Sequence, residues 1–244
     1  MAANKSASIE ARLKNSKELV TSLKTYTEYL PTTDDIKTGE FENYISTVEA
    51  QITPYRNASG AWTNARKRNN AEFKELIRLA KNIRSEIAES RGENSPEYDS
   101  VNSIVKTITG QNVSEHGKTI KSRLKELKEG DSEPLFSSVS GMDFKSRIGS
   151  FRSLTGLLRS YDFYSPSDNS ISMAALEQFL DLITTSLENV FIKGSDFMNE
   201  RSRVIHLFDD KGGLKDRAKR ARLHVKRKYG AKSSEYKALV NRIY

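Results

Sequence analysis

The sequence contains no cysteine, only five prolines and a single tryptophan among its 244 residues. Without cysteine the chain can form no disulfide, Cys-ligated zinc site, iron–sulfur cluster or thiol nucleophile. It also has no run of about 18 apolar residues, the length that a transmembrane helix needs. Residues 1–6 lack the apolar stretch of a secretory signal. We therefore expect a cytoplasmic or intracellular protein, or one inside a particle assembled there.

The composition favours helices over sheets. Hydrophobic residues make up 36% of the chain and charged residues 30%, a mixture typical of long amphipathic helices. A sheet protein would contain more Val, Thr and Gly-marked turns. We therefore predict an all-α fold, and each half of the chain is long enough to bury a core of its own.

The apolar pattern superposes on itself when the sequence is shifted by 135 residues. This shift aligns Pro31 with Pro166 and Trp62 with Phe197. Further along the chain the offset becomes 138, and the difference falls near residues 209–213, a turn-rich stretch where an insertion costs little. Any two amphipathic helices can be slid into register, but matched Pro, Gly, Ser, Glu and Tyr at element boundaries rarely coincide by chance. We therefore predict a tandem duplication.

The predicted fold consists of two tandem, pseudo-equivalent helical bundle units of about four helices each, which would pack as an intramolecular pseudo-dimer. Copy 1 covers residues 1–112, and copy 2 covers residues 142–244 and contains a basic helix near its C-terminus. Residues 113–141 form the predicted linker. They allow a short helix that ends at Gly130, with loop from residue 137 to residue 141.

Periodicity places the helices within each copy. The first helix is expected over residues 8–30 and should stop before a proline. A long second helix follows from about residue 38, with a kink or break at Pro54, and a third helix spans residues 73–87. In copy 2 the second helix should run straighter, over about residues 172–208, with the third helix after it.

One short motif recurs at the turn before the last helix of each copy. The glycine suits a left-handed residue that ends a helix, and the serine three residues later suits an N-cap. Proline fits the first helical position, glutamate faces the positive end of the helix dipole, and tyrosine starts the apolar face. The motif residues are Gly92, Ser95, Pro96, Glu97 and Tyr98 in copy 1, and Gly230, Ser233, Glu235 and Tyr236 in copy 2.

This Gly-x-x-Ser-x-Glu-Tyr turn resembles one in uncharacterised bacterial helical proteins. The resemblance covers only the two turns, at residues 92–98 and 230–236. It implies a helix–helix connection and no activity.

The usual catalytic and metal-binding patterns do not occur. His116, His206 and His224 lie far apart in the sequence, and none has a His or carboxylate at metal-ligand spacing together with a matching partner elsewhere. No Glu-x-x-His pair, phosphate-binding glycine loop or nucleophile elbow is present. The acidic stretches at residues 34–35 and 209–213 lack the spacing of a calcium loop. We therefore predict no catalytic, cofactor-binding or metal-binding residues, and no enzyme activity.

Positive charge gathers in residues 211–232. Ten Lys or Arg residues and one acid, Asp216, give this segment a charge of +9, so the rest of the chain carries −1. Such density attracts polyanions, although the same charges could pair with acids elsewhere in the fold. The candidate polyanion-binding residues are Lys215, Arg217, Lys219, Arg220, Arg222, Lys226, Arg227 and Lys228.

The leading functional hypothesis is a non-enzymatic structural or assembly protein that presents helical surfaces to protein partners or to itself. A component of a larger particle, such as a virion or an intracellular scaffold, would fit this description. The alternative is a nucleic-acid-associated protein that binds the phosphate backbone through residues 211–232. Exposure of the basic helix separates the two hypotheses, because cations buried against neighbouring acids cannot bind a polyanion.

Overall fold

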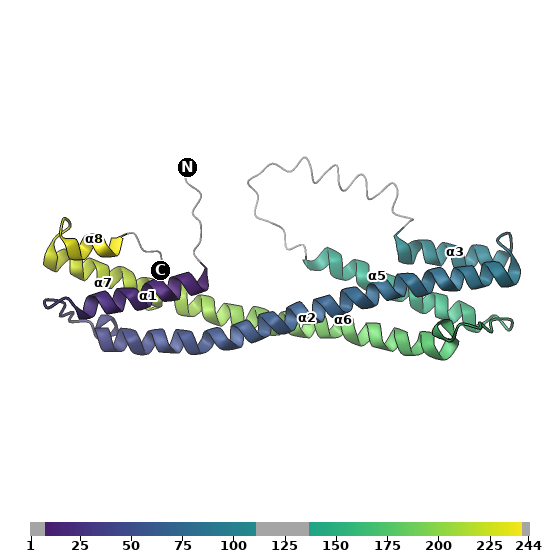
Figure 1. Cartoon of the computed structure of the whole chain (residues 1–244), viewed down its shortest axis with the longest axis horizontal. Coiled ribbons are helices and arrows are strands. Elements are labelled where there is room, and N and C mark those ends of the chain that lie inside the picture. Colours follow the sequence, from purple (N-terminus) through teal and green to yellow (C-terminus); the bar gives the residue numbers. More distant parts are fainter. Residues whose placement is uncertain (1–7, 111–136, 241–244) are drawn as a thin grey trace. The chain divides into compact units, whose positions relative to one another are not determined.

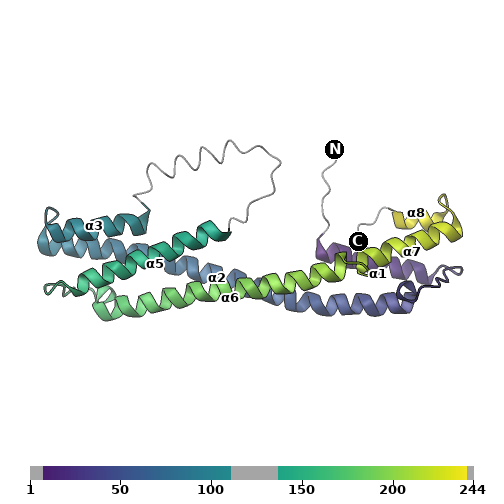
Figure 2. The same cartoon turned by 180° about the vertical axis from the view of Figure 1, so that it is seen from behind.

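A computed structural model describes residues 8–110 and 137–240, and every regular element in these ranges is a helix. The all-α prediction is therefore confirmed. Short 3-10 helices, η1 (Asp34–Ile36) and η2 (Asn169–Ile171), precede the two longest helices. The α-helices in chain order (Figure 1; Figure 2) are α1 (Ile9–Lys24), α2 (Thr38–Arg91), α3 (Pro96–Thr109), α5 (Ser137–Arg159), α6 (Met173–Asp209), α7 (Leu214–Tyr229) and α8 (Ser234–Val240).

The chain forms two compact units. Unit 1 consists of Met1–Trp62 and Lys193–Tyr244, and unit 2 consists of Thr63–Ile192. Helices α2 and α6 each contribute one part to unit 1 and another to unit 2. Each unit therefore takes about half of residues 1–112 and half of residues 142–244. The two compact units therefore do not coincide with the two predicted copies, because each unit combines residues from both copies.

The core of unit 1 is built by α1, the first part of α2, the end of α6, α7 and α8. Helix α1 starts at Ser8, whose Oγ accepts a hydrogen bond from the Ala11 N–H at 3.2 Å. Burying a large apolar side chain stabilises a fold by roughly 1.5–3 kcal/mol. The buried apolar residues that pack together in this core are Leu19, Val20, Leu23, Tyr29, Phe41, Ile45, Val48, Ile52, Val204, Phe208, Leu214, Ala218, Ala221, Val225 and Leu239.

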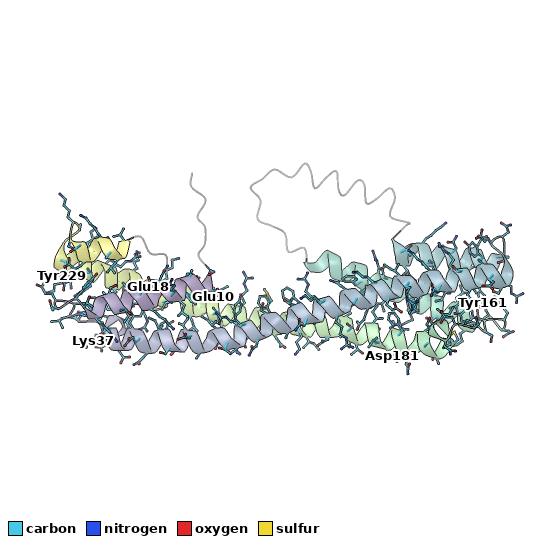
Figure 3. The ribbon with its side chains drawn as sticks, in the orientation of Figure 1. Glu10, Glu18, Lys37, Tyr161, Asp181 and Tyr229 are labelled. Carbon is cyan, nitrogen blue, oxygen red and sulfur yellow. The ribbon has the colours of Figure 1, made fainter. Side chains whose placement is uncertain are left out.

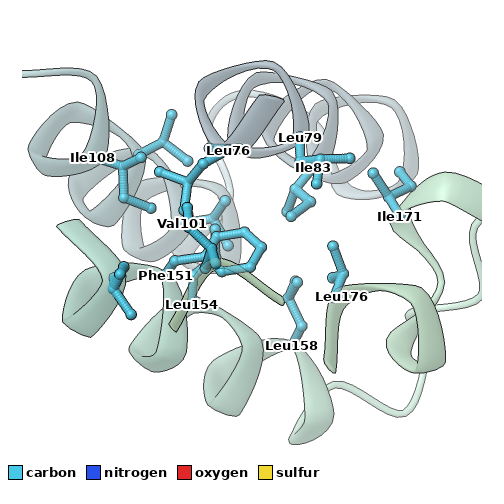
Figure 4. Close-up of a cluster of buried hydrophobic side chains, with 14 of the residues drawn as sticks. Leu76, Leu79, Ile83, Val101, Ile108, Phe151, Leu154, Leu158, Ile171 and Leu176 are labelled. Carbon is cyan, nitrogen blue, oxygen red and sulfur yellow. The ribbon is translucent and has the colours of Figure 1, made fainter. Parts of the chain in front are cut away.

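The core of unit 2 is built by the second part of α2, α3, α5 and the first part of α6. Helix α3 packs along α5, and the Phe151 ring lies beside Leu76 of α2 and Val101 of α3 (Figure 4). The Phe179 ring of α6 meets it edge-on, with centroids 5.8 Å apart. The principal buried residues are Phe73, Leu76, Ala80, Ile83, Ile87, Val101, Val105, Ile108, Ile148, Phe151, Leu154, Leu158, Ile171, Leu176, Ile183 and Leu187.

Buried positions recur between the two units at the offsets found in the sequence. Each pair given below has one member in unit 1 and one in unit 2, and both members are at most 7% exposed. At offset 135 the pairs are Leu19 and Leu154, Leu23 and Leu158, Ile36 and Ile171, Phe41 and Leu176, Val48 and Ile183, Ile52 and Leu187, and Phe73 and Phe208. At offset 138 they are Leu76 and Leu214, Ala80 and Ala218, Ile83 and Ala221, Ile87 and Val225, and Val101 and Leu239.

A tyrosine closes the turn before η1 and η2 in the same way. The Tyr29 hydroxyl donates to the Ile36 carbonyl at 2.7 Å, and the Tyr164 hydroxyl donates to the Ile171 carbonyl at 2.7 Å. Burial raises the pKa of both phenols well above the usual value, so both remain neutral donors. The loop that follows α1 or α5 is thereby tied to the start of the next long helix.

Replacing either tyrosine by phenylalanine should cost about the same free energy. Tyr29→Phe and Tyr164→Phe each remove the hydroxyl and leave a carbonyl without this donor, so each should lower the free energy of unfolding by about 1–2 kcal/mol. Urea unfolding followed by circular dichroism measures the loss. A loss confined to one of the two variants would contradict the equivalence of the two turns.

Helix α2 is longer than the sequence predicts. The prediction at Pro54 is a kink or a break, and the break does not occur, because α2 continues from Thr38 to Arg91. For the same reason the separate third helix over residues 73–87 is wrong. Pro54 removes one backbone donor, but it lies on an exposed part of α2, where water can hydrogen-bond to the freed carbonyl. In the second half of the chain the helix does stop, between α6 and α7.

Two other boundaries differ from the prediction. Helix α1 ends at Lys24, six residues before the expected end, because the chain turns there and brings the Tyr29 hydroxyl to its acceptor. Helix α5 begins at Ser137, where loop was expected, since extending an existing helix needs little intrinsic propensity. The rest of the predicted linker, residues 113–136 with Gly130, lies outside the described residues.

Candidate functional site: the basic helix α7

A tight turn that contains two glycines separates α6 from α7 and lets α7 begin. Gly212 has a φ of +80°, which other residues rarely adopt. A Cβ atom on Gly213 would lie 2.9 Å from the Asp210 carbonyl oxygen and 3.0 Å from the Leu207 carbonyl oxygen. The turn lets α7 bury one narrow stripe against the core of unit 1. That stripe consists of Leu214, Ala218, Ala221, His224 and Val225.

Two of the predicted polyanion-binding arginines are bound inside unit 1. The Arg220 guanidinium forms two hydrogen bonds with the Asp35 carboxylate, and its Nε also lies 3.1 Å from Asp216. Hydrogen bonding to Arg220 holds the pKa of Asp35 below its usual value. Arg217 donates to the Asp35 carbonyl at 2.6 Å and lies over the Tyr44 ring. These two arginines therefore follow the alternative stated above, in which basic side chains pair with acidic residues of the fold.

The remaining candidates lie on the outer part of α7. Lys219 and Lys228 are exposed, and neither makes an ion pair with any residue that the structure describes. Lys226 is exposed, with its Nζ 5.8 Å from the Tyr236 ring centroid, and Arg227 is exposed beside His224. Two other candidates complete the helix: Lys215 is exposed with its Nζ 3.7 Å from Asp209, and Arg222 is half-buried.

His224 is the buried ionisable group of α7. Its ring meets the Tyr29 ring edge-on at 5.2 Å, and its Nδ1 lies 3.3 Å from the Arg227 guanidinium. Burial, together with the charges of Arg227 and Lys228, lowers the pKa of His224 below its usual value. The ring is therefore neutral in the folded protein near pH 7, with Nδ1 as the acceptor for Arg227.

This lowered pKa predicts a loss of stability in mild acid. The unfolded chain binds a proton on His224 below about pH 6.5, whereas the folded chain resists it, so stability is full above pH 6.5 and falls as the pH drops towards the folded pKa. We expect unfolding free energies measured from pH 7.5 to 5.5 to decrease. The decrease should be smaller in His224→Gln, and an equal slope in both proteins would exclude this residue as the cause.

A polar hollow of about 640 Å³ lies beside the turn before α7. Its wall includes Gln51 and Arg203, which both donate to the Glu200 carboxylate, at 2.5 Å and 2.7 Å. His206 and Asp210, also in the wall, are 2.9 Å apart. Because these polar groups are already paired with carboxylates, we assign no ligand to the hollow.

The two Gly-x-x-Ser-x-Glu-Tyr turns have the same geometry. Gly92 and Gly230 have φ values of +86° and +92°. The Ser95 Oγ accepts from the Tyr98 N–H at 3.1 Å, and the matching serine accepts from the Tyr236 N–H at 3.1 Å. Pro96 is the first residue of α3, as Ser234 is of α8, and Glu97 and Glu235 follow them in the first turns. These residues all serve the connection between two helices, and Figure 3 shows Tyr229 at the end of α7, just before the second turn.

The two units differ in charge. Unit 1 contains 22 of the 40 Lys and Arg residues and 14 of the 32 Asp and Glu residues, whereas unit 2 contains 18 of each. The entire formal net charge of +8 therefore belongs to unit 1, and unit 2 is neutral. The charge pattern of the sequence predicted a basic segment at residues 211–232. It did not predict that Asp35 binds Arg217 and Arg220, because Asp35 lies 182 and 185 residues away from them in the chain.

The fold and the site define an all-helical protein with one basic and one neutral compact unit. No family model, curated protein or solved structure matches the chain. Within residues 8–110 and 137–240, no group of His, Asp or Glu residues is arranged to hold a metal ion. No helix in the same ranges is long and apolar enough to span a membrane.

Proposed function

We propose that the chain is a tandem duplication with interleaved copies, and that it acts as a non-enzymatic assembly protein that presents helical surfaces to protein partners. The recurring buried positions and the two identical tyrosine hydrogen bonds support the duplication. The exposed apolar residues of α6 support the assembly function.

The interleaving follows from the composition of each unit. Unit 1 takes α1, η1 and the first part of α2 from copy 1, and the end of α6, α7 and α8 from copy 2. Unit 2 takes the second part of α2 and α3 from copy 1, and α5, η2 and the first part of α6 from copy 2. Each unit thus contains the first half of one copy and the second half of the other, which is the arrangement of a swapped dimer joined into one chain.

A contact between matched residues supports the same interpretation. Trp62 and Phe197 occupy the same place in the two copies, and their rings stack with centroids 5.1 Å apart. Gly194 allows this approach, because a Cβ there would lie 3.2 Å from the Trp62 Nε1. In an isologous pair, a residue of one copy can meet its own equivalent in the other copy in this way.

Helix α6 carries most of the large hydrophobic side chains that are exposed in the described part of the chain. Among the described residues, eight large hydrophobic side chains are exposed, and five of these lie on α6. In unit 1, Met198 and Ile205 are 49% and 42% exposed, and their seven-residue spacing places them on one face of the helix. Single exposed apolar residues are common, but their concentration on one helix supports the proposal of a protein-binding surface there.

The test compares the protein partners retained by two variants in the native cells. Met198→Asp with Ile205→Asp adds two charges to α6, and Leu30→Asp with Leu223→Asp adds two charges at apolar positions elsewhere in unit 1 that are 75% and 52% exposed. We expect a stoichiometric protein partner that is retained by the second variant and lost by the first. Equal retention by both variants would contradict the assigned surface, provided that both keep the wild-type circular dichroism.

A further inference from the structure

We infer that unit 1 binds the phosphate backbone of double-stranded nucleic acid through a cationic face on α7, formed by Lys215, Lys219, Lys226 and Arg227. All four side chains are exposed. This inference goes beyond the proposed assembly function and does not depend on it, because the exposed apolar residues of α6 are not part of this face.

Helical spacing aligns the lysines of the cationic face. Lys215, Lys219 and Lys226 are separated by four and seven residues, so they project within a narrow arc, roughly 120° around α7 from the buried stripe. With a rise of about 1.5 Å per residue, the first and last of them are roughly 16 Å apart along the helix. A row of this length can contact several phosphates, since a duplex carries one charge per about 1.7 Å of its axis.

The local electrostatics of the cationic face differ along α7. Cations in the last turn, such as Lys226 and Arg227, are favoured by the helix dipole. Lys215 lies in the first turn of α7, where the dipole disfavours a positive charge. The Asp209 carboxylate, 3.7 Å from the Lys215 Nζ, offsets this cost, and at this distance on an exposed surface the pair leaves Lys215 able to contact a phosphate.

The matching helix of unit 2 provides an internal comparison. At offset 138, Lys219 corresponds to Lys81, which is also exposed, but the other three positions of the cationic face correspond to residues that are not basic. Those counterparts are Ile77 for Lys215, Ala88 for Lys226 and Glu89 for Arg227. The same helix position thus carries an anion-attracting face in unit 1 and none in unit 2.

The chemistry of the face favours nucleic acid over a protein or a membrane. Three of its four cations are lysines, which are depleted at the cores of protein–protein interfaces. A membrane-surface helix needs a broad exposed apolar face, whereas Leu223 is the only large hydrophobic side chain of α7 that is exposed. Exposed lysines suit phosphate contacts, which position a protein without reading sequence.

The experiment measures binding of the full chain to a fluorescent 20-base-pair duplex of mixed sequence between 50 and 300 mM NaCl. With four phosphate contacts, the plot of log K against log salt concentration should have a slope of about −3.6. Lys215→Gln, Lys219→Gln and Lys226→Gln together should reduce the slope to about −0.9. The same triple variant should weaken binding at 50 mM NaCl at least tenfold, with unchanged circular dichroism.

The control replaces three exposed lysines of unit 2, in Lys74→Gln, Lys81→Gln and Lys106→Gln, and so removes the same charge from the neutral unit. Duplex binding that survives in this variant and is lost in the α7 variant supports the inference. Equal losses in both variants would mean that net charge alone drives binding and would overturn it. So would the absence of duplex binding at 50 mM NaCl, or tighter binding to phosphatidylserine vesicles or polyglutamate at equal anionic charge.

Discussion

Phe151→Ala should lower the free energy of unfolding of unit 2 by about 3–5 kcal/mol. The Phe151 ring is fully buried in the core that α2, α3 and α6 build with α5, and it meets the Phe179 ring of α6 edge-on. Truncation removes the transfer free energy of the ring and leaves a cavity that the surrounding helices cannot close. Guanidinium unfolding of the wild type and the variant, followed by circular dichroism, measures the change.

A second truncation, Phe208→Ala, applies the same test to the core of unit 1. Phe208 is 1% exposed, so its truncation should also destabilise the unit. An effect below about 1 kcal/mol for Phe151→Ala would mean that the ring is not enclosed by α2, α3 and α6. That result would remove the packing on which unit 2 depends.

Gly213→Ala should destabilise unit 1 by about 1–3 kcal/mol, the second largest effect that we expect. A methyl group there would lie within 3.1 Å of the carbonyl oxygens of Asp210, Leu207 and Phe208. All three are backbone atoms, so relief requires moving the turn that starts α7 rather than rotating a side chain.

Gly149→Ala is the matched control for this substitution. Gly149 lies inside α5, and a Cβ there would meet nothing within 4 Å. Alanine is favoured over glycine in a helix by roughly 1 kcal/mol, so this variant should be neutral or more stable. Thermal unfolding distinguishes the two variants. Equal stability of both would show that the turn before α7 tolerates a side chain.

Local patterns in the sequence predicted much of the fold. The helical periodicity and the capping residues Ser95 and Ser233 identified α3, α8 and the turns that precede them. The offset of 135 matched positions such as Leu19 and Leu154, and both of these residues are buried in the structure. The match was visible in the sequence because buried positions are usually apolar. These features depend on residues close together in the chain.

What the sequence could not predict depends on residues far apart. In each unit, helices from the first half of the chain pack against helices from the second half. The same apolar faces would also allow the helices of copy 1 to pack against one another, so the sequence does not distinguish the two arrangements. The ion pair between Arg220 and Asp35 follows from that packing. The sequence alone therefore could not predict which of the eight candidate cations are paired within the fold and which are exposed. The length of α2 was also not predicted. Proline usually interrupts a helix, so Pro54 predicted an interruption, whereas in the structure α2 continues through Pro54 and buries the nearby Ile52 to 2% exposure.

The central claim is that each compact unit is built from both halves of the chain. A protease recognition sequence inserted after Gly130, between the two predicted copies, allows the full-length protein to be cut after it has folded. We expect the two fragments to co-elute at the mass of the intact chain, and to separate only in denaturant as the helical circular dichroism is lost. Fragments that separate in native buffer and each retain their helical signal would contradict the account.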